Sequence, residues 1–481
     1  MDLSLTGRTD VARHPYDSRG VPRRQPLNAW GGADADPRFG RGAALIAAVQ
    51  RSGDRRQSSQ IVATRCPQAP CRTAGKRVTV RALDAGSSAI LKGLIMDVQT
   101  TRRDILRGGL AAAGLGMIGV PEWVLPALAQ GAAVVPFLDF PETFNANPAP
   151  DRRLFDSRTL TSFTTPKDQF FTTQHYGHPV LDEATFKLKI SGLVNAPKAF
   201  SIADLKAMPK GEVMFGFECS GNRAPVQGLC SNGKWTGVPL ATVLKNAGLK
   251  ADAREIVFLG ADHGVEEVEW RTQKYSLDQQ FGRSMQRDKA LSAEPLLAYA
   301  YNDEPLTRHQ GFPLRLIVPG WYGVANVKWL SDIIAQQDPY LGKYQARWYR
   351  TVRGEMVNGE MKWMESAVTH LQLKSYVARI TKEGDTHKVV GVALNDGTPM
   401  KVVEVKVDDG PWQAATFDKQ NSKYSWKLFH FDWKGATPGE HTIVSRVTDV
   451  NGQVQPTEKD LENKKSFLEH NAQHPRRVMI A

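Results

Sequence analysis

One cysteine in this chain stands where a protein would present a thiolate to a ligand. A β-rich run at 213–217 leads into Cys219, and the tight turn Ser-Gly-Asn-Arg follows at 220–223. A soft sulfur at the end of a strand, beside glycine and a cation, is suited to binding a metal or acting as a nucleophile. Most buried cysteines, however, are small hydrophobic side chains without chemistry. On these residues alone both interpretations stay open.

The segments around this cysteine predict short strands and short helices joined by long connections. β-rich runs flanked by turn residues predict strands at 186–190, 213–217, 255–259 and 314–318. Ser201 is expected to cap a short helix, and Pro239 to begin a second helix that ends near Gly248. The sequence Gly-Ala-Asp-His-Gly at 260–264 is expected to form a polar turn. This mixture indicates an α+β domain at 169–364 rather than regular βαβ units.

The sequence pattern becomes β-rich after about residue 365. Four β-rich runs separated by turn residues lie at 387–394, 402–407, 424–433 and 441–450. Strands at this spacing predict an immunoglobulin-like β-sandwich domain at 365–481. The sandwich type rests on the strand pattern, because no Cys…Trp…Cys signature is present.

The N-terminal region does not resemble a folded domain. Residues 1–95 are rich in Arg, Gly, Ala, Pro and Ser and lack hydrophobic periodicity. This composition predicts a disordered arm or a non-native extension, and we favour the extension, with translation starting at Met96.

A segment of the order that a signal peptide requires follows at 96–129. It holds Arg102-Arg103, then an apolar run, then Ala-Leu-Ala at 127–129, which is typical of the twin-arginine export route. A membrane anchor is the alternative, but about 11 to 15 apolar residues are too few to span a bilayer. We therefore expect a periplasmic protein that does not span the membrane, with an N-terminal arm at 130–168.

Charge and cysteine content exclude several functions. The net charge is +12, but residues 1–129 hold 19 basic and 10 acidic residues, so the remainder is nearly neutral. A nucleic-acid footprint is therefore not expected. The chain has four cysteines and no Cys-x-x-Cys-His, so we expect no disulfide framework and no c-type haem in this chain.

Several motifs in order resemble the sulfite oxidase family of molybdopterin-dependent oxidoreductases. They are FFTTQH (170–175), ECSGNR (218–223), Trp235-Thr236-Gly237, GADHG (260–264), LLAYAYNDEPLTRHQGFPLRLIVPG (296–320) and GVANVKWL (323–330). The resemblance implies that 169–364 binds a molybdenum–molybdopterin cofactor, with the Cys219 thiolate as metal ligand. It also implies that 365–481 pairs two copies into a homodimer. Cys230 matches no ligand of the family, and we expect it to be a packing residue.

The resemblance also implies roles for other side chains. The implied cofactor-binding residues are Phe171, Thr172, Thr173, Gln174, His175, Cys219, Asp262, Gln310, Arg315, Asn326, Val327 and Lys328, and the implied catalytic residues are Cys219, Tyr349 and Arg223. Arg315 and Lys328 suit a phosphate, whereas solvated strand-end charges are their ordinary alternative. Asp262 could equally be a turn aspartate and Tyr349 a core aromatic. The family usually has histidine at the position of Gln310.

The substrate side departs from the family. Thr173 and Ala224 stand where sulfite-oxidising members have arginines, and Thr398 corresponds loosely to a third. Each lost charge-assisted contact weakens the binding of a small dianion by about 1.5–3 kcal/mol. Another cation must compensate, for which Arg223, Arg347 and His309 are candidates, or the substrate is not sulfite.

Three functions follow from these observations. The leading hypothesis is a periplasmic enzyme that oxidises sulfite, or a related sulfur compound, to sulfate and passes electrons to an external carrier, a c-type cytochrome. The second is reduction of an S-oxide or another neutral substrate on the same fold. The third is a non-catalytic β-sandwich binding module, for which purified protein would hold no molybdenum and no pterin.

Overall fold

The computed structural model describes residues 133–141, 144 and 152–481. The expected extension at 1–95 and the expected signal segment at 96–129 lie outside these residues. Within the described part, no helix is both long and apolar enough to cross a membrane.

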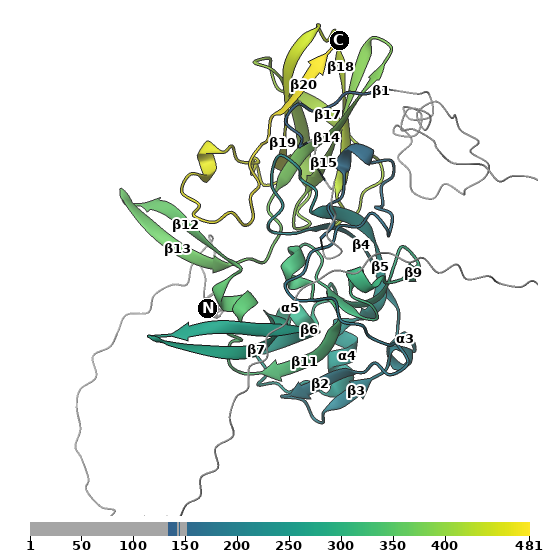
Figure 1. The fold of residues 1–481 in the computed structure, drawn as a ribbon, viewed down its shortest axis with the longest axis vertical. Helices are drawn as coiled ribbons and strands as arrows, with labels where there is room; N and C mark the ends of the chain where they lie inside the picture. The colour runs from purple at the N-terminus through teal and green to yellow at the C-terminus, as the bar shows by residue number, and fades with distance from the viewer. Residues whose placement is uncertain (1–132, 142–143, 145–151) are drawn as a thin grey trace, which may run out of the picture. The chain divides into compact units, whose positions relative to one another are not determined.

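One sheet holds five strands in the order β3-β2-β11-β6-β7. Their bounds are β2 (Leu188–Gly192), β3 (Lys198–Phe200), β6 (Glu255–Trp270), β7 (Gln273–Gln286) and β11 (Leu330–Gln336). Strands β2 and β11 run parallel, and the other neighbours are antiparallel. The far ends of β6 and β7 extend beyond the sheet as a two-stranded ribbon (Figure 1).

The expectation of a turn at 260–264 was wrong, because β6 continues through it. The register with β7 shifts between Leu259 and His263, where β6 carries additional residues. Gly260 makes this bulge possible, since a Cβ there would lie 2.3 Å from the Asp262 carboxylate. The bulge turns the Asp262 side chain inward, where the residue is 5% exposed.

The second sheet has the order β10-β8-β5-β4, with β9 beside β8. Its strands are β4 (Gly211–Glu218), β5 (Cys230–Pro239), β8 (Leu296–Tyr301), β9 (Glu304–Pro305) and β10 (Arg315–Ile317). The described helices are short: α3 (Ile202–Lys206), α4 (Leu240–Ala247), α5 (Arg287–Leu291), the π-helix η4 (Lys343–Arg347), and the 3-10 turns η1 (Ser157–Thr159), η2 (Arg308–Gln310), η3 (Gly323–Ala325) and η5 (Lys459–Leu461).

The predicted helix ends are confirmed. Ser201 forms a capping box with Asp204 at the start of α3, and each side chain accepts a hydrogen bond from the other residue's backbone N–H. Gly248 ends α4 with φ of 71°, a left-handed conformation that glycine adopts without strain.

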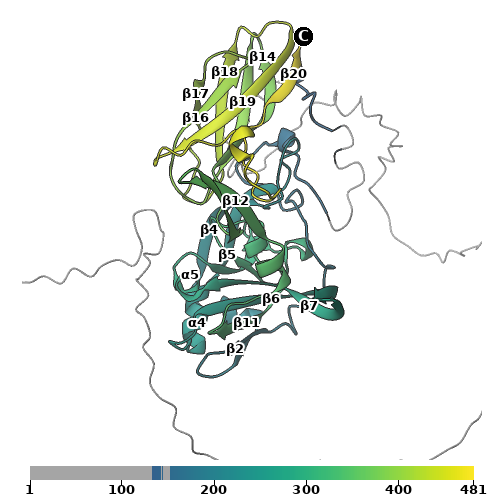
Figure 2. The same ribbon diagram turned by 90° about the vertical axis from the view of Figure 1, so that its left-hand side faces the viewer.

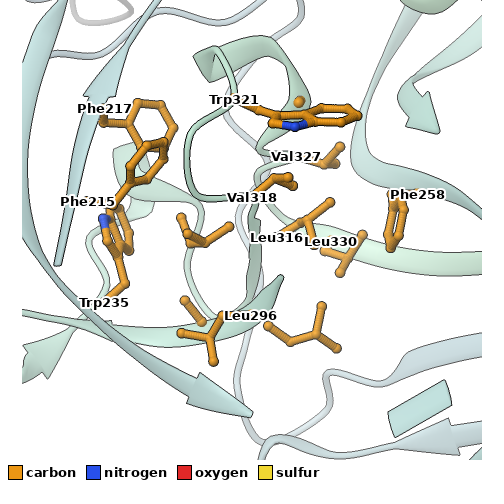
Figure 3. Close-up of a cluster of buried hydrophobic side chains, with 14 of the residues drawn as sticks. Phe215, Phe217, Trp235, Phe258, Leu296, Leu316, Val318, Trp321, Val327 and Leu330 are labelled. Carbon is orange, nitrogen blue, oxygen red and sulfur yellow. The ribbon is translucent and has the colours of Figure 1, made fainter. Parts of the chain in front are cut away.

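A continuous apolar core joins the two sheets (Figure 3). Phe215, Phe217 and Trp235 form one side of it, from β4 and β5, and Leu316 and Leu330 lie between them and Phe258. These six residues are at most 3% exposed. Each such side chain contributes about 1.5–3 kcal/mol of hydrophobic stabilisation, which holds the ends of β4, β10 and β11 together.

The C-terminal region is β-rich, as the strand pattern predicted. Its strands and β1 of the arm form one sheet in the order β1-β14-β15-β18-β17-β16-β19-β20. Figure 2 shows β14, β16, β17, β18, β19 and β20 gathered in this region. Their bounds are β1 (Ala133–Val134), β14 (Lys374–Glu383), β15 (Thr386–Leu394), β16 (Met400–Val407), β17 (Gln413–Phe417), β18 (Lys427–Lys434), β19 (Gly439–Asp449) and β20 (Arg476–Ile480). A separate ribbon, β12 (Arg350–Val357) with β13 (Glu360–Ala367), precedes them. The described protein is mostly β, and the α+β class and the immunoglobulin-like type stay predictions.

The described part of the arm packs against the C-terminal strands. Val135 N–H donates to Ile380 O at 2.9 Å, and Leu138 N–H to Arg477 O at 2.7 Å. Asp139 accepts from the Arg476 guanidinium at 3.0 Å, and its carboxylate lies 3.1 Å from the His474 ring. These contacts hold the pKa of Asp139 down at about 2, although burial alone would raise it.

Candidate active site

A cavity opens beside the end of β4. Its wall includes Cys219 and Tyr349, and also most of the residues expected to bind a cofactor. These are Phe171, Thr172, Thr173, Gln174, His175, Asp262, Arg315, Asn326 and Lys328. Segments far apart in the sequence therefore converge as the motifs predicted.

Backbone hydrogen bonds hold Cys219 at the mouth of the strand pair β4–β5. Its N–H donates to Leu229 O at 2.9 Å, and its carbonyl accepts from Asn222 N–H at 2.9 Å. Gly323 lies against this turn, and a Cβ there would approach the Cys219 Cα to 3.5 Å. Burial raises the pKa of the Cys219 thiol, with a smaller opposing effect from the Gly221 N–H. The thiolate at this place therefore needs a cation beside it.

Tyr349 and His175 form a hydrogen-bonded pair in the cavity wall. The Tyr349 hydroxyl lies 2.7 Å from His175 Nε2. The His175 ring stacks on Phe281 at 5.0 Å between centroids and touches Tyr344 at 4.2 Å. Burial, with a smaller contribution from the charges of Lys328 and Lys343, lowers the pKa of His175 to about 4. His175 is therefore neutral near pH 7 and shares one hydrogen bond with the Tyr349 hydroxyl, whose direction depends on the imidazole tautomer.

The cavity has two cations, and both reach main-chain carbonyls. Arg315 is 3% exposed and donates to Gln310 O at 2.8 Å and to Asn326 O at 3.0 Å. None of the described carboxylates forms an ion pair with it, and burial lowers its pKa to about 9. The Lys328 ammonium donates to Thr173 O at 3.1 Å and to His309 O at 3.3 Å. The buried Arg315 guanidinium, which forms no ion pair with a described carboxylate, is suited to bind an anionic ligand.

Several buried polar atoms around the cavity have no hydrogen-bond partner within the described chain. They are Thr172 Oγ1, Gln174 Oε1, Asp262 Oδ1, Gln310 Nε2 and Arg315 Nε. An unsatisfied buried polar group costs about 1–3 kcal/mol, so a cluster of them marks a place for a polar ligand. Burial also raises the pKa of Asp262 to about 6, against the opposing charge of Lys328.

Comparison with known proteins finds similarity to molybdopterin-dependent enzymes. Residues 175–344 match the family described as "Oxidoreductase molybdopterin binding domain". The mitochondrial sulfite oxidase of Homo sapiens is 30% identical over 346 residues, which are 65% of this chain and 60% of that protein. The corresponding protein of Rattus norvegicus is 29% identical over 347 residues, with the same coverage. The chain is therefore similar to sulfite oxidases and contains a match to their molybdopterin-binding domain.

Two further proteins are similar to this chain. Sulfite oxidase of Arabidopsis thaliana is 26% identical over 355 residues, which are 66% of this chain and 86% of that protein. The crystal structure of the sulfane dehydrogenase SoxCD from Paracoccus pantotrophus is similar in fold, with a TM-score of 0.58 and 22% identity. The match covers 79% of this chain and 100% of that one. The chain spans about 60% of the length of the rat and human relatives.

The residues in the cavity fit the molybdopterin of this family. Cys219 offers the soft thiolate that a high-valent metal accepts from a protein. Arg315 has an Nε donor without a partner, and Asp262 has an acceptor oxygen without one. A phosphate-bearing pterin with ring N–H groups would satisfy both, because it brings an anion and hydrogen-bond donors together.

Four other predicted residues lie outside the cavity wall. The Gln310 side chain is buried behind it, where Oε1 accepts from Thr307 N–H at 3.0 Å. Val327 is fully buried in the apolar core. The exposed Arg223 guanidinium lies 5.9 Å from the Phe467 ring centre. Cys230 is a buried packing residue whose sulfur lies 2.9 Å from the Tyr376 hydroxyl.

Of Arg347 and His309, two candidates to replace the missing substrate-binding arginines, only His309 lines the cavity. Arg347 is exposed and absent from the cavity wall, whereas His309 lines it and lies 3.0 Å from the His178 ring. Thr398 lines a different groove, beside Lys423 and Lys427.

The structure adds aromatic residues that the sequence did not single out. Phe217 lines the cavity, two residues before Cys219 on the same face of β4. The period of two in a strand could have revealed it. Phe281 reaches the cavity from β7, opposite the bulge in β6, and no local signal marks it.

Proposed function

We propose that this protein is a molybdenum-dependent oxidoreductase that oxidises a sulfur centre and passes the electrons to an external carrier. The observation that carries the proposal is the convergence of Cys219, the Tyr349–His175 pair and the unpaired Arg315 on one cavity. Export by the twin-arginine route to the periplasm and a c-type cytochrome as the carrier belong to the same proposal.

The chain's own residues would hold the group at three points. Cys219 would ligate the metal, Arg315 and Lys328 would face the phosphate, and Asp262 would accept from pterin N–H groups. When bound, the group supplies a redox metal that exchanges an oxygen atom and two electrons with the substrate. Oxidation of sulfite then balances as sulfite plus water giving sulfate, two protons and two electrons.

The Tyr349–His175 pair would handle a proton at this site. Because the phenol shares a single hydrogen bond with neutral His175, the Tyr349 oxygen keeps a lone pair to accept a hydrogen bond from water or substrate in either tautomer. The rings of Phe281 and Tyr344 pack against His175 and fix the direction in which Nε2 points. This geometry positions one acceptor for a proton that the reaction releases.

The charge distribution supports a second candidate substrate. Thr173 and Ala224 bring no charge, and Arg223 is exposed and outside the cavity wall. A cofactor phosphate would engage Arg315 and Lys328, so a sulfite dianion would meet few cations. Sulfane sulfur carries less charge, and the structurally similar SoxCD is named a sulfane dehydrogenase. We carry sulfane oxidation as the alternative to sulfite oxidation.

Cytochrome c reduction by the purified, molybdenum-loaded protein separates the candidates. Turnover with sulfite at micromolar to millimolar concentration supports the leading proposal. No sulfite turnover with full metal loading refutes it, and turnover with glutathione persulfide then supports the sulfane alternative. Protein expressed with an active cofactor supply that still holds neither molybdenum nor pterin would refute both.

A further inference from the structure

A buried ion pair connects the C-terminal domain to the turn that carries Cys219. Lys374 is the first residue of β14, and Glu218 is the last residue of β4 (Figure 1). The Lys374 ammonium lies 2.8 Å from Glu218 Oε1, and the two side chains are 2% and 1% exposed. The two residues are 156 positions apart in the sequence, so this contact joins distant segments of the chain.

The same ammonium also holds the turn itself. Lys374 donates to Asn222 O at 2.9 Å, and Asn222 Nδ2 donates to Glu218 Oε1 at 2.9 Å. Asn222 Oδ1 accepts from the Leu229 backbone N–H at 2.9 Å. The backbone N–H of Asn222 donates to Cys219 O, also at 2.9 Å. Residues on both sides of Cys219 are therefore fixed through one lysine.

A second C-terminal segment holds the turn from its other side. Glu469 N–H donates to Ser220 O at 2.7 Å, and Glu469 Oε2 accepts from the Thr351 hydroxyl at 2.6 Å. Ser220 and Glu469 are 1% and 4% exposed. The C-terminal domain thus borders the cysteine from residue 218 to residue 222.

We propose that Lys374 is a positioning residue for the metal ligand Cys219, and that it neutralises the charge of Glu218 beside that ligand. The proposal rests on the proposed molybdenum site. Glu218 Oε2 has no partner within the described chain, so Lys374 is the cation that balances this carboxylate. Without Lys374 the turn loses two hydrogen bonds, and a buried negative charge stands next to the ligand.

Three variants of the full-length, cofactor-loaded protein test the proposal. Lys374→Met removes the cation at similar length. Lys374→Met combined with Glu218→Gln removes both charges and keeps one acceptor for Asn222. Arg446→Met is the control, because Arg446 pairs with Glu404 at 2.8 Å on β16 and β19, outside the turn network.

The expected results distinguish a displacement of Cys219 from a general loss of protein stability. Lys374→Met lowers kcat about ten- to a hundred-fold with little change in KM, since a displaced ligand slows the reaction without touching the substrate. It also shifts the Mo(V) electron paramagnetic resonance g-values and makes the metal's reduction potential more negative. The double variant restores the potential toward that of the wild type. A Lys374→Met protein with wild-type g-values, potential and kcat would overturn the proposal, whatever its melting temperature.

The cofactor-free protein gives an independent readout. Iodoacetamide alkylation of Cys219, followed by peptide mass spectrometry, should become several-fold faster in the Lys374→Met, Glu218→Gln double variant, because the turn opens and no uncompensated charge is left beside the thiol. Equal rates in the wild type, the double variant and Arg446→Met would refute the positioning role. A wild type that never acquires molybdenum would refute the proposed function instead, and the alkylation result would still stand.

Discussion

Replacing His175 by glutamine should remove a specific pH dependence from the stability of the cofactor-free protein. The folded pKa of His175 is about 4 against an ordinary value of 6.5, with burial as the main cause. The unfolded chain therefore binds the proton more tightly than the folded one. The stabilisation by neutral His175 is complete above pH 6.5 and is lost as the pH falls from 6.5 to 4.

The size of the effect follows from the difference between the two pKa values. A shift from 6.5 to about 4 corresponds to about 3 kcal/mol of unfolding free energy, since one pKa unit is about 1.4 kcal/mol. Most of this is lost by about pH 4.5. Urea unfolding at pH 7.5 and at pH 4.5 should show a loss in the wild type that exceeds the loss in His175→Gln by about 2–3 kcal/mol.

Tyr349→Phe is the matched control, because it removes the hydrogen bond but leaves the imidazole in place. This variant should be less stable at every pH and should keep the pH dependence of the wild type. If His175→Gln and the wild type lose the same free energy between pH 7.5 and 4.5, His175 is not held neutral.

The remaining predictions concern the metal, the cofactor and the arm. Cys219→Ser should retain the fold and lose nearly all activity, because an alcohol is a poorer ligand than a thiolate; full activity would remove Cys219 from the metal shell. Tyr349→Phe should lower kcat of the loaded enzyme about a hundred-fold or more if the phenol directs a proton; unchanged kcat and pH profile would refute that role. Arg315→Lys should weaken cofactor retention about ten- to a hundred-fold, the equivalent of one charge-assisted hydrogen bond, measured as molybdenum and pterin content after dialysis. Asp139→Asn should destabilise the protein by about 2 kcal/mol at pH 7, from its pKa of about 2 against 3.8. Its difference from the wild type should shrink as the pH falls through 3.8 toward 2, and a difference independent of pH would contradict it.

Local sequence patterns predicted most of the elements around the site. The β-rich run at 213–217 is strand β4, and it presents Cys219 at its end. Ser201 caps a helix, and Gly248 ends one in a left-handed conformation. These features depend on neighbours a few residues away, so the sequence carries them directly. The ordered motifs added what periodicity could not, because they indicated which distant segments meet in one cavity.

The failures arise where long-range pairing decides the local conformation. Gly-Ala-Asp-His-Gly reads as a turn, but β7 and β11 pair with β6 on both sides and keep it extended. The bulge at Gly260 reconciles the polar sequence with the strand and directs Asp262 into the cavity. Lys374 was missed for the same reason, because it contacts Glu218 from 156 positions away in the sequence.

The residues expected to support the metal ligand Cys219 and those expected to face the substrate differ in their contacts. One set can therefore change in sequence without the other. The metal side depends on buried contacts, namely Glu218, Asn222 and Lys374, and losing one of them leaves a buried charge or polar group unpaired. The substrate side depends on Thr173 and Ala224, which are half-buried and make no ion pairs. Substitution there costs little stability. A chain of this family can therefore keep its thiolate ligand and still change the charge of the sulfur compound that it accepts.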